Sequence, residues 1–216
     1  MATEVDPGER LRFVAADLMS DDGWADAMAG VDHVLHVASP MGAAWDFMAS
    51  DEGPTTLTTV LPSAIFGPIL SKATLGSVMV VGRILSGKMP GNPRVGFSVV
   101  DVRDLAVAHV LAMTSAEAAG QRLIATNEFL WMADIARELR AALGPRAARV
   151  STRVLPDTAV RLAAKLDANL RNITLTLGRR HAFNSGKARQ VLGWTPRPGA
   201  QTVVDCAESL LTHGVF

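Results

Sequence analysis

The chain has 216 residues, enough for one sizeable hydrophobic core or for one domain with a smaller lobe. Hydrophobic residues make up 49% and charged residues 19%, and 21 basic residues balance 21 acidic ones, which argues against a nucleic-acid partner because phosphate binding needs a basic excess. The single cysteine, Cys206, predicts a reducing, cytoplasmic location, and we expect no membrane partner because no apolar stretch has the length of a membrane span.

The first part of the chain alternates predicted strands and helices. Strands are predicted over Leu11–Ala15, Val31–Pro40 and Thr56–Leu61. Between them lie two predicted helices, one that is capped by Asp21 or Asp22 and ends at Ala29, and one over Ala43–Ala49. This order predicts right-handed crossovers and a parallel sheet with helices on its faces.

The later part has more predicted helix than strand. Leu61–Pro68 contains two prolines and a glycine, which predicts a shaped loop. The following elements are helices over Ser77–Leu85, Asp101–Met113, Met132–Leu143, Asp157–Leu166, Ser185–Leu192 and Thr202–Leu211, and strands over Val95–Val100, Arg122–Ala125 and Val150–Leu155. We therefore predict an α/β fold, an incomplete Rossmann-like parallel sheet with helices on its faces plus a small mixed C-terminal lobe.

The predicted sheet is organised around Val31–Pro40, an apolar run that ends in small residues and a proline. In open parallel sheets, ligands bind outside the carboxyl ends of the strands. Val37, Ala38 and Ser39 are therefore candidates for contact with a bound cofactor. The alternative is an ordinary core strand that runs into an ordinary turn.

Segments along nearly the whole chain match one enzyme family. They are Phe13–Leu18 (FVAADL), His36–Pro40 (HVASP), Ala43–Phe47 (AAWDF), Leu57–Pro68 (LTTVLPSAIFGP), Phe97–Ala106 (FSVVDVRDLA) and Lys187–Pro198 (KARQVLGWTPRP). With these segments in the family's order, the chain resembles the extended short-chain dehydrogenase/reductases, and within them the dihydroflavonol-reductase-like, NAD-dependent epimerase/dehydratase branch. The resemblance implies a partial Rossmann-like domain over residues 1–126, in which loop 61–94 belongs to the substrate side, and a substrate lobe over residues 127–216.

The resemblance also implies NAD or NADP as cofactor and a small ketone or aldehyde as substrate. It implies cofactor contacts at the adenine for Asp17 and Leu18, near the ribose for Val37, Ala38 and Ser39, and at the nicotinamide for Pro62 and Ile65. Structural roles stay open for the same residues. Asp17 can cap the following helix, Ser39 can hydrogen-bond its own turn, and Pro62 can shape a loop.

Groups that carry the family's chemistry are missing from these residues. No G-x-G-x-x-G turn is present to hold the cofactor's pyrophosphate at a helix N-terminus, and Met1 is expected to lie past that point. The chain contains no tyrosine, so the Tyr-x-x-x-Lys pair that would protonate the substrate cannot form. In the family this pair precedes AAWDF, which here follows Met41 and Gly42 directly.

These observations leave two functional hypotheses. The chain resembles an NAD(P)-dependent carbonyl reductase that is inactive by itself, with weak or absent cofactor binding and no assigned catalytic residue. Alternatively, it is a truncated, non-catalytic remnant that acts at most as a weak nucleotide- or protein-binding module. In both cases an incomplete sheet exposes an edge, which predicts self-association.

Other groups of polar residues give weaker indications of a functional site. Asp101 is expected to cap a helix and Arg103 to pair with a nearby carboxylate, although the two together with Asp104 can also be interpreted as a charged catalytic cluster. No metal site is predicted, because the histidines lack ligand spacing. Cys206 is expected to pack in the core. Arg179 and Arg180 form either a contact for an anionic substrate or a solvated basic turn.

Overall fold

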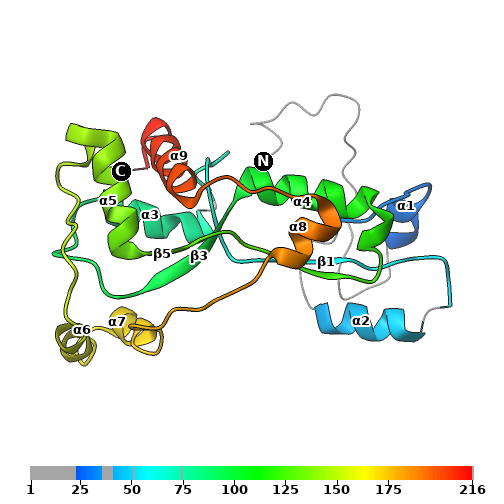
Figure 1. The fold of residues 1–216 in the computed structure, drawn as a ribbon, viewed down its shortest axis with the longest axis horizontal. Helices are drawn as coiled ribbons and strands as arrows, with labels where there is room; N and C mark the ends of the chain where they lie inside the picture. Colours follow the sequence, from blue (N-terminus) through cyan, green and yellow to red (C-terminus); the bar gives the residue numbers. More distant parts are fainter. Residues whose placement is uncertain (1–22, 36–40, 51, 74, 216) are drawn as a thin grey trace. The chain divides into compact units, whose positions relative to one another are not determined.

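The structure is a computed structural model that describes residues 23–35, 41–50, 52–73 and 75–215 (Figure 1). By its contacts the chain divides into two compact units, Met1–Thr55 and Thr56–Phe216, and each is described by itself. Among the described residues, no helix is long and apolar enough to cross a membrane.

Short strands and mostly short helices make up the described residues. The strands are β1 (Thr59–Pro62), β2 (Ala64–Phe66), β3 (Gly96–Asp101), β4 (Arg122–Ala125) and β5 (Phe129–Trp131). The helices are α1 (Trp24–Met28), α2 (Met41–Ser50), α3 (Met79–Leu85), α4 (Val102–Thr114), α5 (Met132–Leu143), α6 (Asp157–Ala163), α7 (Ala168–Ile173), α8 (Gly186–Leu192) and α9 (Gly199–Thr212).

The first unit contains α1 and α2, whose residue ranges nearly match the two helices predicted there. The prediction of a buried strand from Val31 is wrong over residues 31–35, which have no strand conformation. The side chains of Val31, Val34 and Leu35 are 45%, 52% and 52% exposed. An apolar run becomes a buried strand only where other strands pair with it and helices cover its faces. The expected strand Leu11–Ala15 and residues 36–40 lie outside the described residues.

The second unit contains the α/β fold expected from the sequence. β1 pairs with β4 in parallel, with Thr59 opposite Arg122. A second sheet has the order β2-β3-β5, in which β2 and β3 are parallel and β3 and β5 are antiparallel. The stretch Leu61–Pro68 is more regular than predicted, because the chain leaves β1 and enters β2 within it. The loop character appears only after β2, at Gly67, which has a φ of 126°.

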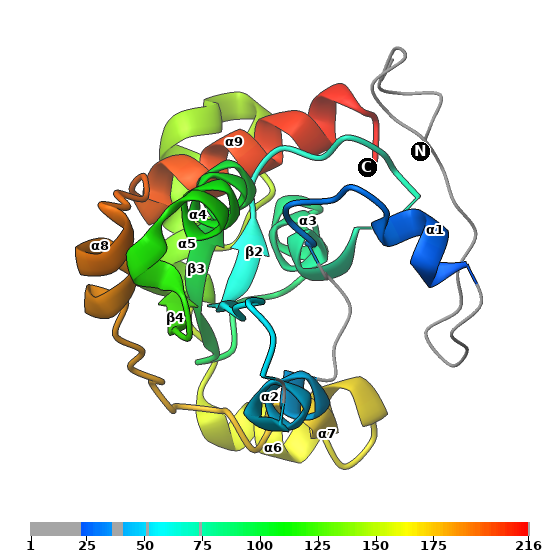
Figure 2. The ribbon, with the colours of Figure 1, turned by 90° about the vertical axis from the view of Figure 1, so that its right-hand side faces the viewer.

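Two hydrophobic clusters hold this unit together. In the first, α3, α5 and α9 pack against the sheet of β2, β3 and β5, and the two longer helices α5 and α9 lie side by side (Figure 2). Its fully buried side chains include Phe66, Ile135, Leu139 and Leu210. The second cluster joins α4 and α8 to β4 and contains Trp194, which is 2% exposed.

The helical pattern of the sequence predicts most of these elements. α5 spans the predicted residues, and it buries Ile135 and Leu139 but exposes Ala142. The helix predicted over Asp101–Met113 is also confirmed as α4, and its Val110 faces solvent with 56% exposure. The strand expected over Val150–Leu155 is reduced to a single bridge between Asn92 and Val154. α7 forms between the helices predicted over Asp157–Leu166 and Ser185–Leu192, where no element was predicted.

Candidate functional site

The carboxyl ends of β1 and β4 form one candidate edge for a ligand. Pro62 is opposite Ala125 at the end of the ladder, and its ring is exposed. Beyond the ladder, the Ser63 amide donates to the Ala125 carbonyl oxygen at 3.3 Å, and the Thr126 hydroxyl donates to the Ser63 hydroxyl at 2.8 Å. These hydrogen bonds hold Ser63, the residue directly after Pro62, against the end of β4.

Ile65 lies in β2, the strand that follows this edge. Its side chain is half-buried against the second hydrophobic cluster, and its carbonyl oxygen accepts a hydrogen bond from the Ser77 hydroxyl at 2.5 Å. The structure therefore leaves Pro62 open to solvent and holds Ile65 in the packing. The other predicted cofactor contacts lie outside the described residues, and these are Asp17, Leu18, Val37, Ala38 and Ser39.

Asp101 caps α4 and also pairs with arginine, as the sequence predicts. Its carboxylate accepts from the Arg103 amide at 2.9 Å and from the Arg103 Nη2 at 2.7 Å, and the same Nη2 donates to Asp205 of α9 at 2.6 Å. Burial raises the pKa of Asp101, but hydrogen bonds and attraction from Arg103, with attraction from Arg197, outweigh burial and hold the pKa below its usual value.

Asp104 makes a second ion pair on the next turn of the chain. It accepts from Arg197 through Nη2 at 2.8 Å, Nε at 3.0 Å and the backbone amide at 2.8 Å. The buried indole of Trp194 donates to the Asp104 carbonyl oxygen at 2.8 Å. Both carboxylates are thus occupied by arginines, so the group links α4 to the segment before α9 and offers no free general acid. This geometry favours the structural interpretation of the Asp101–Asp104 segment over the catalytic one.

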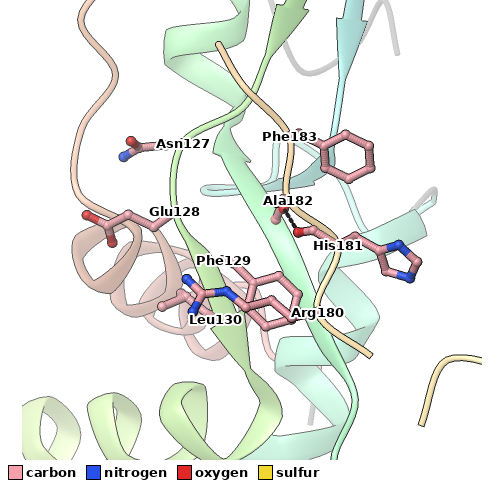
Figure 3. Close-up of a pocket in the computed structure, with 9 residues that line it drawn as sticks. Asn127, Glu128, Phe129, Leu130, Arg180, His181, Ala182 and Phe183 are labelled. Atoms are coloured by element: carbon pink, nitrogen blue, oxygen red, sulfur yellow. Dashed lines mark hydrogen bonds between the residues drawn. The ribbon is translucent and has the colours of Figure 1, made fainter. Parts of the chain in front are cut away.

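A pocket of about 400 Å³ lies over β3 and β5 (Figure 3). Its lining residues are Ser98, Asn127, Glu128, Phe129, Leu130, Arg180, His181, Ala182 and Phe183. The Arg180 guanidinium lies over the Phe129 ring, 5.4 Å from the centroid. Sequence patterns did not locate this pocket, because residues 180–183 have no regular structure that would show where they dock.

Cys206 and the possible metal ligands were the remaining candidates for a functional site. Cys206 is fully buried in α9, and burial raises the pKa of its thiol to about 11, which keeps it protonated at neutral pH. This agrees with the expected core role. Among the described residues, no three His, Cys, Asp or Glu side chains are placed to hold a metal ion.

Known reductases share both sequence and fold with this chain. Ketoreductase azaE of Aspergillus niger is 30% identical over 199 residues, which cover 87% of this chain and 53% of that protein. Cinnamoyl-CoA reductase 1 of Oryza sativa is 38% identical over 84 residues, which cover 39% of this chain and 25% of that protein. No family model matches the chain.

A structure of yeast methylglyoxal/isovaleraldehyde reductase Gre2 complexed with NADPH has the same fold. It superposes with a TM-score of 0.62 at 24% identity and covers 82% of this chain and 54% of the yeast chain. The chain is therefore similar in sequence and in fold to the extended short-chain dehydrogenase/reductases. Its α/β architecture is the Rossmann-like fold of this family. The chain spans about half the length of the ketoreductase and of the yeast reductase.

Proposed function

We propose that this chain carries part of an NAD(P)-dependent reductase that acts on a small ketone or aldehyde. The similarity to a ketoreductase over 87% of the chain supports this substrate class. A related fold that binds NADPH supports the cofactor class. In the proposal, residues 1–126 belong to the cofactor-binding part, with loop 61–94 on the substrate side, and residues 127–216 form the substrate lobe.

The exposed ring of Pro62 at the paired ends of β1 and β4 is the observation that carries the proposal. Open α/β sheets bind ligands at such carboxyl ends, and the nicotinamide of a bound cofactor would supply a hydride there. Pro62 has no amide hydrogen, so it offers the cofactor an apolar surface. In the proposal Pro62 and Ile65 border the nicotinamide, while Asp17 and Leu18 contact the adenine and residues 37–39 lie near the ribose.

The described residues fit the nicotinamide end of a cofactor better than its diphosphate. Pro62 and the hydrogen-bonded Ser63 and Thr126 provide a fixed edge. The diphosphate needs backbone amides of a glycine-rich turn, and the sequence contains no G-x-G-x-x-G. We therefore propose weak cofactor binding.

Protonation of the product alkoxide is the step for which these residues offer no donor. The 216 residues include no tyrosine, and the buried carboxylates of Asp101 and Asp104 are both ion-paired with arginines. By itself the chain is therefore proposed to be inactive in carbonyl reduction. The same lack of tyrosine favours the second candidate function, a non-catalytic module that binds a nucleotide or a protein weakly.

A measurement of enzyme turnover tests whether the chain by itself is inactive, as proposed, or is an active reductase. NADPH oxidation by the chain is followed at the nicotinamide absorbance with a panel of aldehydes and ketones. We expect no enzyme-dependent oxidation. Oxidation that saturates with both NADPH and one carbonyl, and that does not occur when the chain is left out, would show that the chain has its own proton donor and would contradict the proposed inactivity.

A further inference from the structure

The outer face of α4 is apolar and exposed to solvent. In the second unit α4, α5 and α9 are the long helices, with 13, 12 and 14 residues (Figure 1). The inner face of α4 packs Leu105 and Ala108 into the second hydrophobic cluster. On the outer face, Val102, Val107 and Val110 are 38%, 50% and 56% exposed. These valines are therefore part of the surface of the second unit.

The outer residues of α4 line up at helical spacing. Val102, Ala106, Val110 and Thr114 follow one another at intervals of four residues, and all of them are exposed. Residues at this interval form one ridge along a helix, and Val107 lies beside the ridge. None of the four ridge residues is charged. The outer face of α4 is therefore a continuous apolar surface along most of the helix.

The other long helices of this unit turn polar residues to solvent. The exposed residues of α5 include Arg137, Glu138 and Arg140, and those of α9 include Gln201 and Thr212. Such a division into an apolar and a polar face is typical of a surface helix, whereas a helix that is apolar all round is typical of a buried one. The composition of α4 therefore fits a helix that is covered on both faces.

The charges at the two ends of α4 indicate what covers the outer face. Arg103 lies at the amino end, and its side chain is 39% exposed. Glu117 follows the carboxyl end and is exposed, and its carboxylate accepts a hydrogen bond from the Ser115 hydroxyl at 2.8 Å. In an antiparallel pair of α4 helices, the basic amino end of each copy lies beside the acidic carboxyl end of the other, and the helix dipoles attract in the same sense. The face is thus complementary to itself under a two-fold axis.

We propose that the outer face of α4 is the contact between two copies of this chain. The two helices run antiparallel, and the two-fold axis passes near the middle of the ridge, between Ala106 and Val110. The ridge of each copy packs into the groove beside the ridge of the other, and the small side chain of Ala106 allows a close approach. An anionic lipid surface fits this face less well, because lipid-binding helices carry a row of basic side chains that the ridge lacks.

The length of the helix limits the strength of this contact. At 1.5 Å per residue α4 is about 20 Å long, so the contact is smaller than a standard protein interface, and we expect a dimer with a Kd of some tens of micromolar. The inference does not depend on the proposed reductase function, since it involves neither Pro62 nor Ile65. It also concerns a different surface from the free edge of β1.

Sedimentation equilibrium of the full chain, from about 1 µM to about 1 mM, measures the association. The test variant is Val110→Lys, which places a charge at the centre of the proposed contact. Because Val110 is 56% exposed, the lysine remains solvated in the monomer. The matched control is Val154→Lys, at another exposed valine outside α4, with 44% exposure. Circular dichroism and thermal unfolding of both variants establish that the fold is retained.

Cysteine cross-linking tests the orientation of the two helices. In the proposed antiparallel pair, Val102 of one copy faces Thr114 of the other. A mixture of the Val102→Cys and Thr114→Cys variants should therefore form a disulfide-linked dimer on mild oxidation, whereas each variant alone should not. Cys206 is fully buried and does not compete in the native chain.

We expect a monomer–dimer equilibrium for the wild-type chain. Val110→Lys should raise the dimer Kd at least about tenfold, because the contact would bury an unpaired charge, and Val154→Lys should change it by less than about twofold. A wild-type chain that stays monomeric, or one whose association is equally strong in Val110→Lys, would overturn the proposal. Cross-linking of either cysteine variant with itself would refute the antiparallel arrangement. A monomer that binds phosphatidylserine vesicles and loses this binding in Val110→Lys would assign the face to a lipid surface instead.

Discussion

Replacing Asp104 by asparagine breaks the ion pair that joins α4 to the segment before α9. The carboxylate of Asp104 is 9% exposed and the Arg197 side chain is 26% exposed. Asparagine keeps the shape and one acceptor oxygen but removes the negative charge, and its amide hydrogens would point at the guanidinium. Arg197 would then remain partly buried with only the more distant Asp101 carboxylate, 3.7 Å from its Nε, as counter-ion.

The size of the effect follows from this burial. Hydrogen bonds to charged groups contribute about 1.5–3 kcal/mol, and loss of one member of a fully buried ion pair costs about 3–5 kcal/mol. Because Arg197 is only partly buried, we expect a loss of about 2–3 kcal/mol in the free energy of unfolding. At a slope of about 2 kcal/mol per molar urea, the unfolding midpoint would fall by about 1–1.5 M.

Urea unfolding followed by tryptophan fluorescence measures this change, since Trp194 is buried and its indole is bonded to Asp104. Glu208→Gln is the matched control, because Glu208 also pairs with an arginine, Arg146, but the two side chains are 42% and 54% exposed. We expect no change in midpoint beyond experimental error for this control. If Asp104→Asn shifts the midpoint no more than Glu208→Gln, the Asp104–Arg197 pair does not stabilise the fold as described.

Further predictions concern other parts of the structure. The Cys206 thiol, buried and with a pKa raised to about 11, should react with Ellman's reagent at pH 8 only after denaturation, and rapid labelling of the native chain would contradict its burial. The pKa of Asp101 is held below its unfolded value of about 3.9, so its contribution to stability is complete above that pH and is lost as the pH falls through the folded pKa. Acid unfolding should therefore depend less on pH in Asp101→Asn, and an unchanged dependence would count against the ion pair. Among the described strands β1 pairs only with β4, and Leu166 and Leu175 are 93% and 75% exposed, so we expect sedimentation to detect concentration-dependent self-association. A single monomer species at all concentrations would be the opposite result.

Elements with a strong local signal could be predicted from the sequence. In α5, Ile135 and Leu139 are one helical turn apart and Gly144 follows the last residue, so both the buried face and the end are encoded locally. The capping role of Asp101 is of the same kind, because a cap depends on residues next to it in the chain.

Elements that depend on distant partners could not be predicted in this way. Val31, Val34 and Leu35 look like a buried strand, but strand formation requires pairing that the run itself does not specify. Ala64–Phe66 forms β2 within a stretch with loop-like composition because β3 offers it a parallel partner.

In the candidate site, too, the residues found from a sequence motif differ from those that depend on long-range contacts. The family motif brought attention to Pro62 and Ile65, and the structure shows one exposed and the other packed. The docking of Arg180 on Phe129 depends on a long-range contact and on the missing side chain of Gly96. The spacing of Phe129 and Trp131, which puts both rings on one strand face, was the signal that could have indicated an aromatic floor.

Equilibrium titration of the full chain with NADPH, followed by the fluorescence of the nicotinamide, tests most directly the proposal that the chain binds this cofactor only weakly. We expect weak binding, with a Kd of about 1 mM or higher, because no glycine-rich turn holds the diphosphate. Saturable binding with a Kd of a few micromolar would contradict that expectation, and it would show that other residues of this chain secure the diphosphate.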